Sequence, residues 1–245
     1  MRLDKYLSHA TGASRSQVHH WLRHKRILVN GVLCTQAAHP LTEPSEVLLD
    51  GEAVTLPQDG YWMLHKPQGV VCANTDGHYP TVIDLVSSHL APHHLQIAGR
   101  LDVDTTGLVL ITTDGRWNHQ ITAPKKHCQK IYRVQLSQPL NPEHFQQLNE
   151  GIHLHGEKKP CLAAEAFALN THHYLLAIYE GKYHQVKRMM AALNNHVVNL
   201  HRIAIGGVQL STLAPGQFRP LLPSEITQLA NKPQCLKLAE VAQHL

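Results

Sequence analysis

The stretch GRLDVDTTGLVL (residues 99–110) combines two aspartates, two threonines and two glycines with an apolar run. Asp, Thr and Gly are typical of tight turns, and the run LVLIT (108–112) has the composition of a buried strand. The stretch therefore predicts a tight loop that leads directly into a strand of the core. Asp102 and Asp104 lie in that loop, and three interpretations compete: a solvated turn, a calcium-binding loop, or a catalytic carboxylate at a strand end.

The calcium interpretation depends on the residues at positions one, three, five and six of an EF-hand loop, which are Asp102, Asp104, Thr106 and Gly107. The twelfth position of such a loop supplies a bidentate glutamate, and here it is Thr113. The flanking segments also have strand patterns, whereas an EF-hand needs helices. The sequence therefore argues against calcium and leaves the turn and the catalytic carboxylate.

The bulk composition is that of a globular chain: 245 residues, 43% hydrophobic and 16% charged. The N-terminus has no apolar signal-peptide core, and no apolar run reaches the roughly 18–20 residues that span a bilayer. The five cysteines are odd in number and include no CxxC pair, which favours free thiols in a reducing compartment. We therefore expect a cytoplasmic protein that does not contact membranes.

The 21 histidines raise the question of a metal site. They are spread along the chain, with no HExxH motif and no ligand-spaced Cys/His set. Neither a Walker loop nor a GxGxxG fingerprint is present. The sequence therefore predicts no metal and no nucleotide cofactor.

Positive charge is concentrated in two segments, although the net charge is only +4. Residues 1–26 contain one acid, Asp4, and residues 116–133 contain none. The basic residues of the two segments are Arg2, Lys5, Arg15, Arg23, Lys25, Arg26, Arg116, Lys125, Lys126, Lys130 and Arg133. Either cluster alone fits a solvated face, but the two together indicate a polyanion that is contacted in two places.

Residues 1–59 form a predicted domain of their own. Residues 2–9 have the pattern of a short helix, and Ser14 with Gln17 forms a capping box that begins a second helix. Asn30-Gly31, between two β-branched runs, predicts a hairpin over 27–33. Residues 51–60, with Pro57 and a closing Asp-Gly pair, read as a linker.

The rest of the chain mixes strands and helices without regular alternation, which predicts an α+β domain around a mixed, mostly antiparallel sheet. We place this domain at 60–231, followed by a C-terminal tail, 232–245, whose last ten residues, LKLAEVAQHL, are expected to form a loosely held helix. The expected strands are 61–65, 95–98, 108–112, 130–136, 161–169, 174–179 and 196–205. The expected helices are 81–86, 115–121 after Asp114 as N-cap, 142–150 and 184–194.

Several motifs carry a family resemblance. MRLDKYLS, SRSQ and the VNG of the hairpin resemble the S4 RNA-binding domain, and GRLDVDTTGL resembles the catalytic motif of pseudouridine synthases. HKPQGVVCAN (65–74), KIYRV (130–134) and GKYHQVKRM (181–189) are similar to further motifs of that family, in the family's order. HCQKIY and NHVVNLHRIAIGG resemble the S4-domain-containing ribosomal small-subunit (16S rRNA) branch, so that the similarity covers about residues 1–230.

The resemblance implies an S4-like domain followed by a pseudouridine synthase domain, and an isomerase that converts one uridine of 16S rRNA, of the uridine-516 class, to pseudouridine. This reaction breaks the C1′–N1 bond and rejoins the base through C5, so it requires no cofactor. The implied partner is 16S rRNA, free or in an assembling small subunit, and we expect a monomer.

The resemblance also assigns roles to residues. Asp102 is the implied catalytic carboxylate, Tyr132 lies against the target base, and Lys187 pairs with Asp102, whose ionised form a cation favours. Asp104 is assigned to the turn. The expected RNA-binding residues are Arg2, Arg15, Arg23, Lys25, Arg26, Arg100, Arg116, Lys125, Lys126, Lys130, Lys182 and Arg188.

Two positions depart from the family pattern. His65 stands where asparagine is usual, and Lys182 where arginine is usual. The second departure matters for RNA contacts, because an ammonium group is a point charge and cannot make the bidentate phosphate contact of a guanidinium.

Three alternatives stay open at this point. In the first alternative the chain modifies large-subunit rRNA. In the second it is a non-catalytic S4 RNA-binding or ribosome-assembly protein. Glycoside hydrolysis by Asp102 and Asp104 is the weakest alternative, because two carboxyls in one tight turn are poorly placed to act on opposite sides of a sugar.

Overall fold

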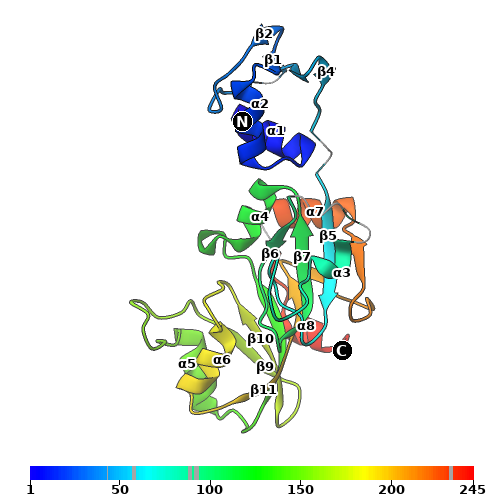
Figure 1. Ribbon diagram of the computed structural model, residues 1–245. Coiled ribbons are helices and arrows are strands. Elements are labelled where there is room, and N and C mark those ends of the chain that lie inside the picture. The colour runs from blue at the N-terminus through cyan, green and yellow to red at the C-terminus, as the bar shows by residue number, and fades with distance from the viewer. Residues whose placement is uncertain (43, 57–58, 88–89, 91–93, 232–233) are drawn as a thin grey trace. The chain divides into compact units, whose positions relative to one another are not determined.

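The computed structural model describes the chain except residues 43, 57–58, 88–89, 91–93 and 232–233. The chain divides into two compact units, Met1–Asp59 and Gly60–Leu245 (Figure 1).

The N-terminal unit packs two helices against a small sheet. Helices α1 (Leu3–Thr11) and α2 (Arg15–Arg23) are followed by a four-stranded sheet in the order β2-β1-β3-β4. The strands are β1 (Ile27–Val29), β2 (Val32–Leu33), β3 (Val47–Leu49) and β4 (Glu52–Ala53). Its core is a cluster of buried residues that includes Leu3, Leu7, Val18, Leu22 and Ile27.

The local signals in this unit are confirmed. The Ser14 side chain accepts from the Gln17 amide while the Gln17 side chain accepts from the Ser14 amide, which completes the capping box of α2. Asn30 and Gly31 both have positive φ, 50° and 75°, as the two-residue turn between β1 and β2 requires. The sequence did not predict β3 and β4, and β4 lies within the segment 51–60 that was expected to be a linker, of which 57–58 lie outside the described residues.

A mixed sheet forms the centre of the second unit. Its strand order is β13-β5-β7-β11-β8-β10-β9 within the described ranges, with β12 paired to β11 and β6 paired to β7. Every pairing is antiparallel except β7 with β11, which confirms the expected α+β class. The strands are β5 (Tyr61–Lys66), β6 (Gln96–Ala98), β7 (Thr106–Thr112), β8 (Lys130–Leu136), β9 (Glu165–Ala168), β10 (His173–Ile178), β11 (Val197–Ile205), β12 (Val208–Gln209) and β13 (Phe218–Pro220).

The helices of this unit are α3 (Asp84–Ser87), α4 (Gly115–Thr122), the 3-10 turn η1 (Pro124–Lys126), α5 (Pro142–Glu150), α6 (Gln185–Ala192), α7 (Pro223–Ala230) and α8 (Leu238–Ala242). Three of them, α4, α5 and α6, begin within one residue of their predicted positions, whereas η1 and α7 were not predicted. Asp114 caps α4 by accepting from the amides of Arg116 and Trp117, as predicted. The segment 81–86 differs: helix α3 begins only at Asp84, whose carboxylate accepts from the Thr81 amide and hydroxyl.

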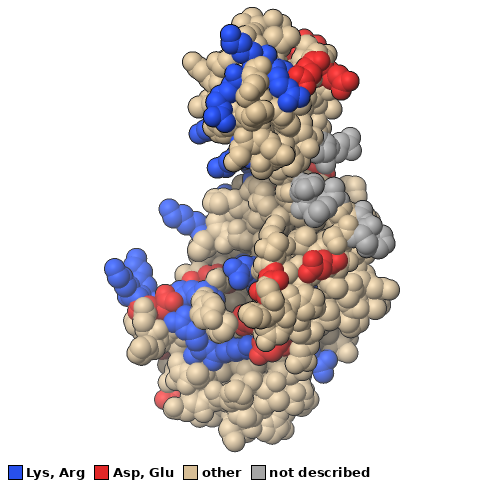
Figure 2. Space-filling model, in the orientation of Figure 1, with Lys and Arg blue, Asp and Glu red and all other residues tan. Residues whose placement is uncertain are grey.

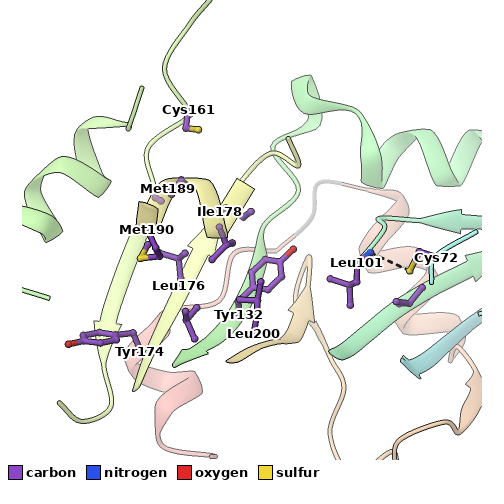
Figure 3. Packing of buried hydrophobic residues seen from close by; sticks show 14 of the residues in the cluster. Cys72, Leu101, Tyr132, Cys161, Tyr174, Leu176, Ile178, Met189, Met190 and Leu200 are labelled. Atoms are coloured by element: carbon purple, nitrogen blue, oxygen red, sulfur yellow. Dashed lines mark hydrogen bonds between the residues drawn. The ribbon is translucent and has the colours of Figure 1, made fainter. Parts of the chain in front are cut away.

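The apolar run of β7 is buried on both faces of the sheet. Val109 and Ile111 belong to one hydrophobic cluster, and Leu108 and Leu110 belong to another. Figure 3 shows residues of the first cluster, in which Tyr132 lies among Leu176, Ile178 and Leu200. A continuous apolar strand of this kind is expected at the centre of a sheet that is covered on both sides.

Two expectations about the later chain need correction. The expected strand 161–169 is shortened to β9, because the amides of Cys161 and Ala164 donate to Ile152 and Leu148 and not to a neighbouring strand. The C-terminal helix is not loosely held, since Leu238 and Val241 of α8 are buried in a cluster with Ile131 and Leu175. No helix in the described part of the chain is long and apolar enough to cross a membrane.

Candidate active site

The loop between β6 and β7 carries Asp102 and is held by a buried lysine. Lys66, with 0% exposure, donates from Nζ to the carbonyl of Thr105 at 2.7 Å and to that of Val103 at 3.4 Å. The amide of Gly69 donates to the same Val103 carbonyl at 2.8 Å. Burial lowers the pKa of the Lys66 ammonium. Groups in strand β5 and in the turn that follows it therefore hold the loop by hydrogen bonds to its backbone carbonyls.

Two cationic or titratable side chains converge on Asp102. Lys187 Nζ lies 3.2 Å from Oδ2, and His184 Nε2 lies 3.3 Å from Oδ1. Lys187 also donates to Asp104 at the shorter distance of 2.6 Å. The expected Lys187–Asp102 pair is therefore present, but Lys187 is shared between the two aspartates of the loop.

The contacts that Lys187 makes with both aspartates shift the pKa values of Lys187 and Asp104. Partial burial lowers the pKa of Lys187, but its hydrogen bonds to Asp104 and Asp102 raise it more, so that the pKa lies above the ordinary value. For Asp104, burial raises the pKa, but the Lys187 hydrogen bond and charge lower it more, so that it lies below the ordinary value. Lys187 is therefore a cation at neutral pH, and Asp104 is an anion.

The start of α6 places His184 and Lys187 beside Asp102. His184 has a left-handed backbone, with φ of 48°, and stands at the N-cap of α6. The segment is held by Gln185, whose side chain accepts from the Lys182 amide and donates to Glu180. With His184 at the N-cap and Lys187 in the first turn of α6, both side chains reach the Asp102 carboxylate.

Tyr132 lies on β8 with its ring largely buried, at 7% exposure (Figure 3). Its partner in the sheet register is Arg202 on β11, whose Nη1 lies 3.4 Å from the phenol oxygen. The Arg202 guanidinium is 1% exposed, and it also donates to the carbonyls of Gly99 and Leu108 at 2.6 and 2.7 Å. Arg202 thus joins the tyrosine strand to both ends of the loop that carries Asp102.

A cavity of about 1040 Å³ opens between these groups. Asp102, Tyr132 and Lys187 all line it, so the fold brings together the three residues that the resemblance marked as catalytic. Figure 2 shows Lys and Arg side chains gathered with Asp and Glu around a hollow in this unit. The lining contains five Lys or Arg against three Asp, namely Arg100, Lys130, Lys182, Lys187 and Arg202 against Asp76, Asp102 and Asp104.

The expected RNA-binding residues fall in several places. Arg100, Arg116, Lys125 and Lys126 are exposed on the second unit, and Arg2, Arg15, Arg23 and Lys25 are exposed on the first. Arg26 is half-buried and pairs with Asp50, while Arg2 pairs with Asp4. Lys182 and Arg188 both pair with Glu157, at 3.4 and 3.2 Å.

The structure corrects the prediction that Lys130 belongs to an RNA-binding surface. It is 5% exposed, and its Nζ donates to the carbonyls of Cys128 at 2.8 Å and Ile121 at 3.5 Å. Burial lowers its pKa. The reason is its place as the first residue of β8, where its side chain turns into the fold and satisfies backbone carbonyls in place of phosphate groups.

Sequence reasoning missed two residues that build the site, Lys66 and Arg202. Lys66 lies in the HKPQG motif, so a signal was present. Arg202 lies in the quoted stretch NHVVNLHRIAIGG, but its contact with Tyr132 depends on the register of two strands and joins residues 70 positions apart. In the described part of the chain, no group of three His, Cys, Asp or Glu side chains is placed to hold a metal ion.

Comparisons with known proteins agree over almost the whole chain. Residues 60–192 match the family model described as RNA pseudouridylate synthase, and residues 1–48 match the S4 domain model. A protein of Haemophilus influenzae named ribosomal small subunit pseudouridine synthase A is 46% identical over 231 residues, which cover 94% of this chain and 99% of the relative.

The protein with the same name from Escherichia coli K12 is 44% identical over 232 residues and covers 94% of this chain and 100% of its own length. A solved structure titled as that of a pseudouridylate synthase superposes with a TM-score of 0.69 at 44% identity, over 94% of this chain and 99% of the other.

Proposed function

The chain belongs to the RNA pseudouridylate synthase family and carries an S4 domain, and from this premise we propose that it isomerises one uridine of small-subunit (16S) rRNA, of the uridine-516 class, with Asp102 as the catalytic carboxylate. The substrate is supported by the names of relatives that match over 94% of the chain. The single observation that carries the residue assignment is the convergence of Lys187 and His184 on Asp102 in a cavity that Tyr132 also lines.

Asp102 acts at the ribose of the target uridine. Its carboxylate, beside the Lys187 ammonium at 3.2 Å, serves either as a nucleophile toward the sugar or as a base at the ribose. In both routes the C1′–N1 bond breaks, the uracil turns within the cavity, and C5 bonds to C1′ before it loses its proton. The atoms of uridine and pseudouridine are the same, so the conversion needs no oxidant or group donor.

Tyr132 and the basic side chains hold the substrate. The ring of Tyr132 lies against the uracil, and Arg202 sets its orientation through the phenol oxygen. The uridine must leave its stack in the RNA to reach the cavity, at a cost of about a few kcal/mol. Exposed basic residues, among them Arg100, Arg116, Lys125 and Lys126, offset this cost by contacts to phosphates, which weaken as salt rises.

The test measures tritium release from C5-labelled uridine in 16S rRNA transcripts and in assembly intermediates. Asp102→Asn should lower the release rate by at least about 1,000-fold, while RNA binding stays close to that of wild type. Asp104→Asn is the matched control in the same loop. Substantial release by Asp102→Asn would overturn the role of this carboxylate.

Two further outcomes would overturn the substrate assignment. Release from large-subunit and not from small-subunit transcripts would move the target to the other ribosomal RNA. RNA binding by the wild-type protein without any pseudouridine in either RNA would leave a non-catalytic S4 protein. Mapping of pseudouridines in rRNA from cells that lack the protein identifies the nucleotide itself.

A further inference from the structure

Exposed aromatic rings gather at the opening of the cavity. In the described part of the chain, three Phe, Tyr or Trp residues are exposed: Tyr183 at 76%, Tyr79 at 50% and Phe167 at 37%. Tyr79 and Tyr183 both line the cavity that contains Asp102, and they come from segments about one hundred residues apart. A single exposed ring needs no explanation, but two of three at one opening indicate a ligand with flat apolar faces.

Tyr183 has one covered face and one open face. Its ring stacks on the imidazole of His184, with centroids 3.8 Å apart and planes inclined by 19°. His184 in turn contacts Asp102 at 3.3 Å. Because the residue is three-quarters exposed, the face opposite His184 is free to take a second planar group.

Tyr79 is held on a loop with a fixed backbone. The Asp76 carboxylate accepts from the amides of His78 and Tyr79 at 2.8 and 2.9 Å. The ends of the loop are joined by hydrogen bonds from Val71 to Pro80 and from Val82 to Val71, at 3.0 and 2.9 Å. The exposed ring is therefore presented at the cavity opening by a constrained turn.

The surrounding charge identifies the ligand as part of a nucleic acid. Arg100 lines the same cavity as the two rings and is exposed. Single-stranded nucleic acids are bound by aromatic rings that stack on bases beside basic groups that contact phosphates. RNA carries both the planar bases and the phosphates that such a surface binds.

We propose that Tyr183, supported by His184, and Tyr79 form a subsite that stacks on nucleobases adjacent to the target uridine. The inference rests on the proposed function, because it describes how the neighbours of the uridine are held once that nucleotide has entered the cavity. It assigns to the two rings a role in binding and not in the chemical step.

The test is a double-mutant cycle between protein and RNA, made on a transcript whose modified uridine has been mapped with the wild-type protein. Tyr183→Ala should raise the KM and the dissociation constant of the RNA about tenfold, with kcat changed less than threefold. Tyr183→Phe should remain within about twofold of wild type, and Tyr183→Trp should bind at least as tightly, because both keep a planar ring. Tyr79→Ala should act in the same direction.

The RNA arm replaces the nucleotide on either side of the uridine by an abasic one. If Tyr183 stacks on that base, the abasic RNA binds wild type as weakly as intact RNA binds Tyr183→Ala, and the two changes together weaken binding no further. Phe167→Ala is the matched control, since this exposed ring on β9 does not line the cavity.

Three results would overturn the subsite. The first is unchanged binding by Tyr183→Ala and Tyr79→Ala, and the second is full additivity with both abasic RNAs. The third is a loss confined to kcat, equal on intact and abasic RNA, which would mean that Tyr183 acts only through His184. Failure of the proposed function is a separate result, in which the wild-type protein itself forms no pseudouridine.

Discussion

Arg202 lies beside Tyr132 on neighbouring strands, with its Nη1 3.4 Å from the phenol oxygen and its guanidinium carbon 5.9 Å from the ring centroid. The same buried group donates to Gly99 and Leu108, which flank the Asp102 loop. One side chain therefore relates the position of the carboxylate to that of the aromatic ring. In this way Arg202 fixes the Asp102 loop and the Tyr132 ring relative to each other, although they come from distant segments of the chain.

Arg202→Lys should destabilise the protein and slow the reaction. The three acceptors are reached by three different nitrogens of the guanidinium, which a single ammonium nitrogen cannot reproduce, so at least one buried acceptor loses its partner, at a cost of about 1–3 kcal/mol. We expect a lower urea midpoint and a kcat for tritium release reduced more than about tenfold. Tyr132→Phe, which removes only the 3.4 Å contact, should change stability by less than about 1 kcal/mol. An unchanged urea midpoint for Arg202→Lys would contradict the role of Arg202 in joining Tyr132 to the Asp102 loop.

Asp104→Asn should be far milder than Asp102→Asn. Asp104 contributes to the raised pKa of Lys187, so its loss lowers that pKa toward the ordinary value but leaves Lys187 protonated at neutral pH. We expect kcat to fall less than about tenfold at pH 7, against at least about 1,000-fold for Asp102→Asn. Single-turnover rates of the two variants, measured side by side, test this difference. Equal losses of rate would show that the two carboxylates act as a pair.

His201 should make stability depend on pH between 6.5 and 4. Burial, together with the nearby His65 and Arg133, lowers its pKa from 6.5 to about 4. In this window the unfolded chain binds a proton that the folded chain does not, so the free energy of unfolding falls as pH falls, by about 1–2 kcal/mol because the ring is partly exposed to solvent. His201→Gln should reduce this slope in urea unfolding at several pH values. Equal slopes for the two proteins would show that His201 does not carry the effect.

Gly107→Ala should disrupt the junction between β7 and β11. Gly107 has a φ of 111°, and a Cβ there would lie 2.2 Å from the backbone oxygen of Arg202. We expect a loss of at least about 3 kcal/mol in the free energy of unfolding, because both the backbone conformation and the close approach require glycine. Gly77→Ala, where a Cβ meets nothing within 4 Å, should change stability by less than about 0.5 kcal/mol. Similar thermal midpoints for the two variants would contradict the close packing.

The sequence by itself determined the features that depend on a few neighbouring residues. The Ser14–Gln17 capping box, the Asn30-Gly31 turn, the Asp114 cap and the apolar run of β7 act over short distances, and each appears in the fold where it was expected. The motif resemblance likewise drew attention to Asp102, Tyr132 and Lys187, which the structure places around one cavity.

Only the tertiary structure decided which side chains meet across the sheet. The β8–β11 register brings Arg202 to Tyr132, the close approach of β5 to the loop brings Lys66 to Thr105, and the start of β8 turns Lys130 inward. The physical reason is that a strand's side chains alternate between its two faces, whereas the neighbour that each one meets depends on pairing with residues far away in the chain. No local pattern around Lys130 or Arg202 records that pairing.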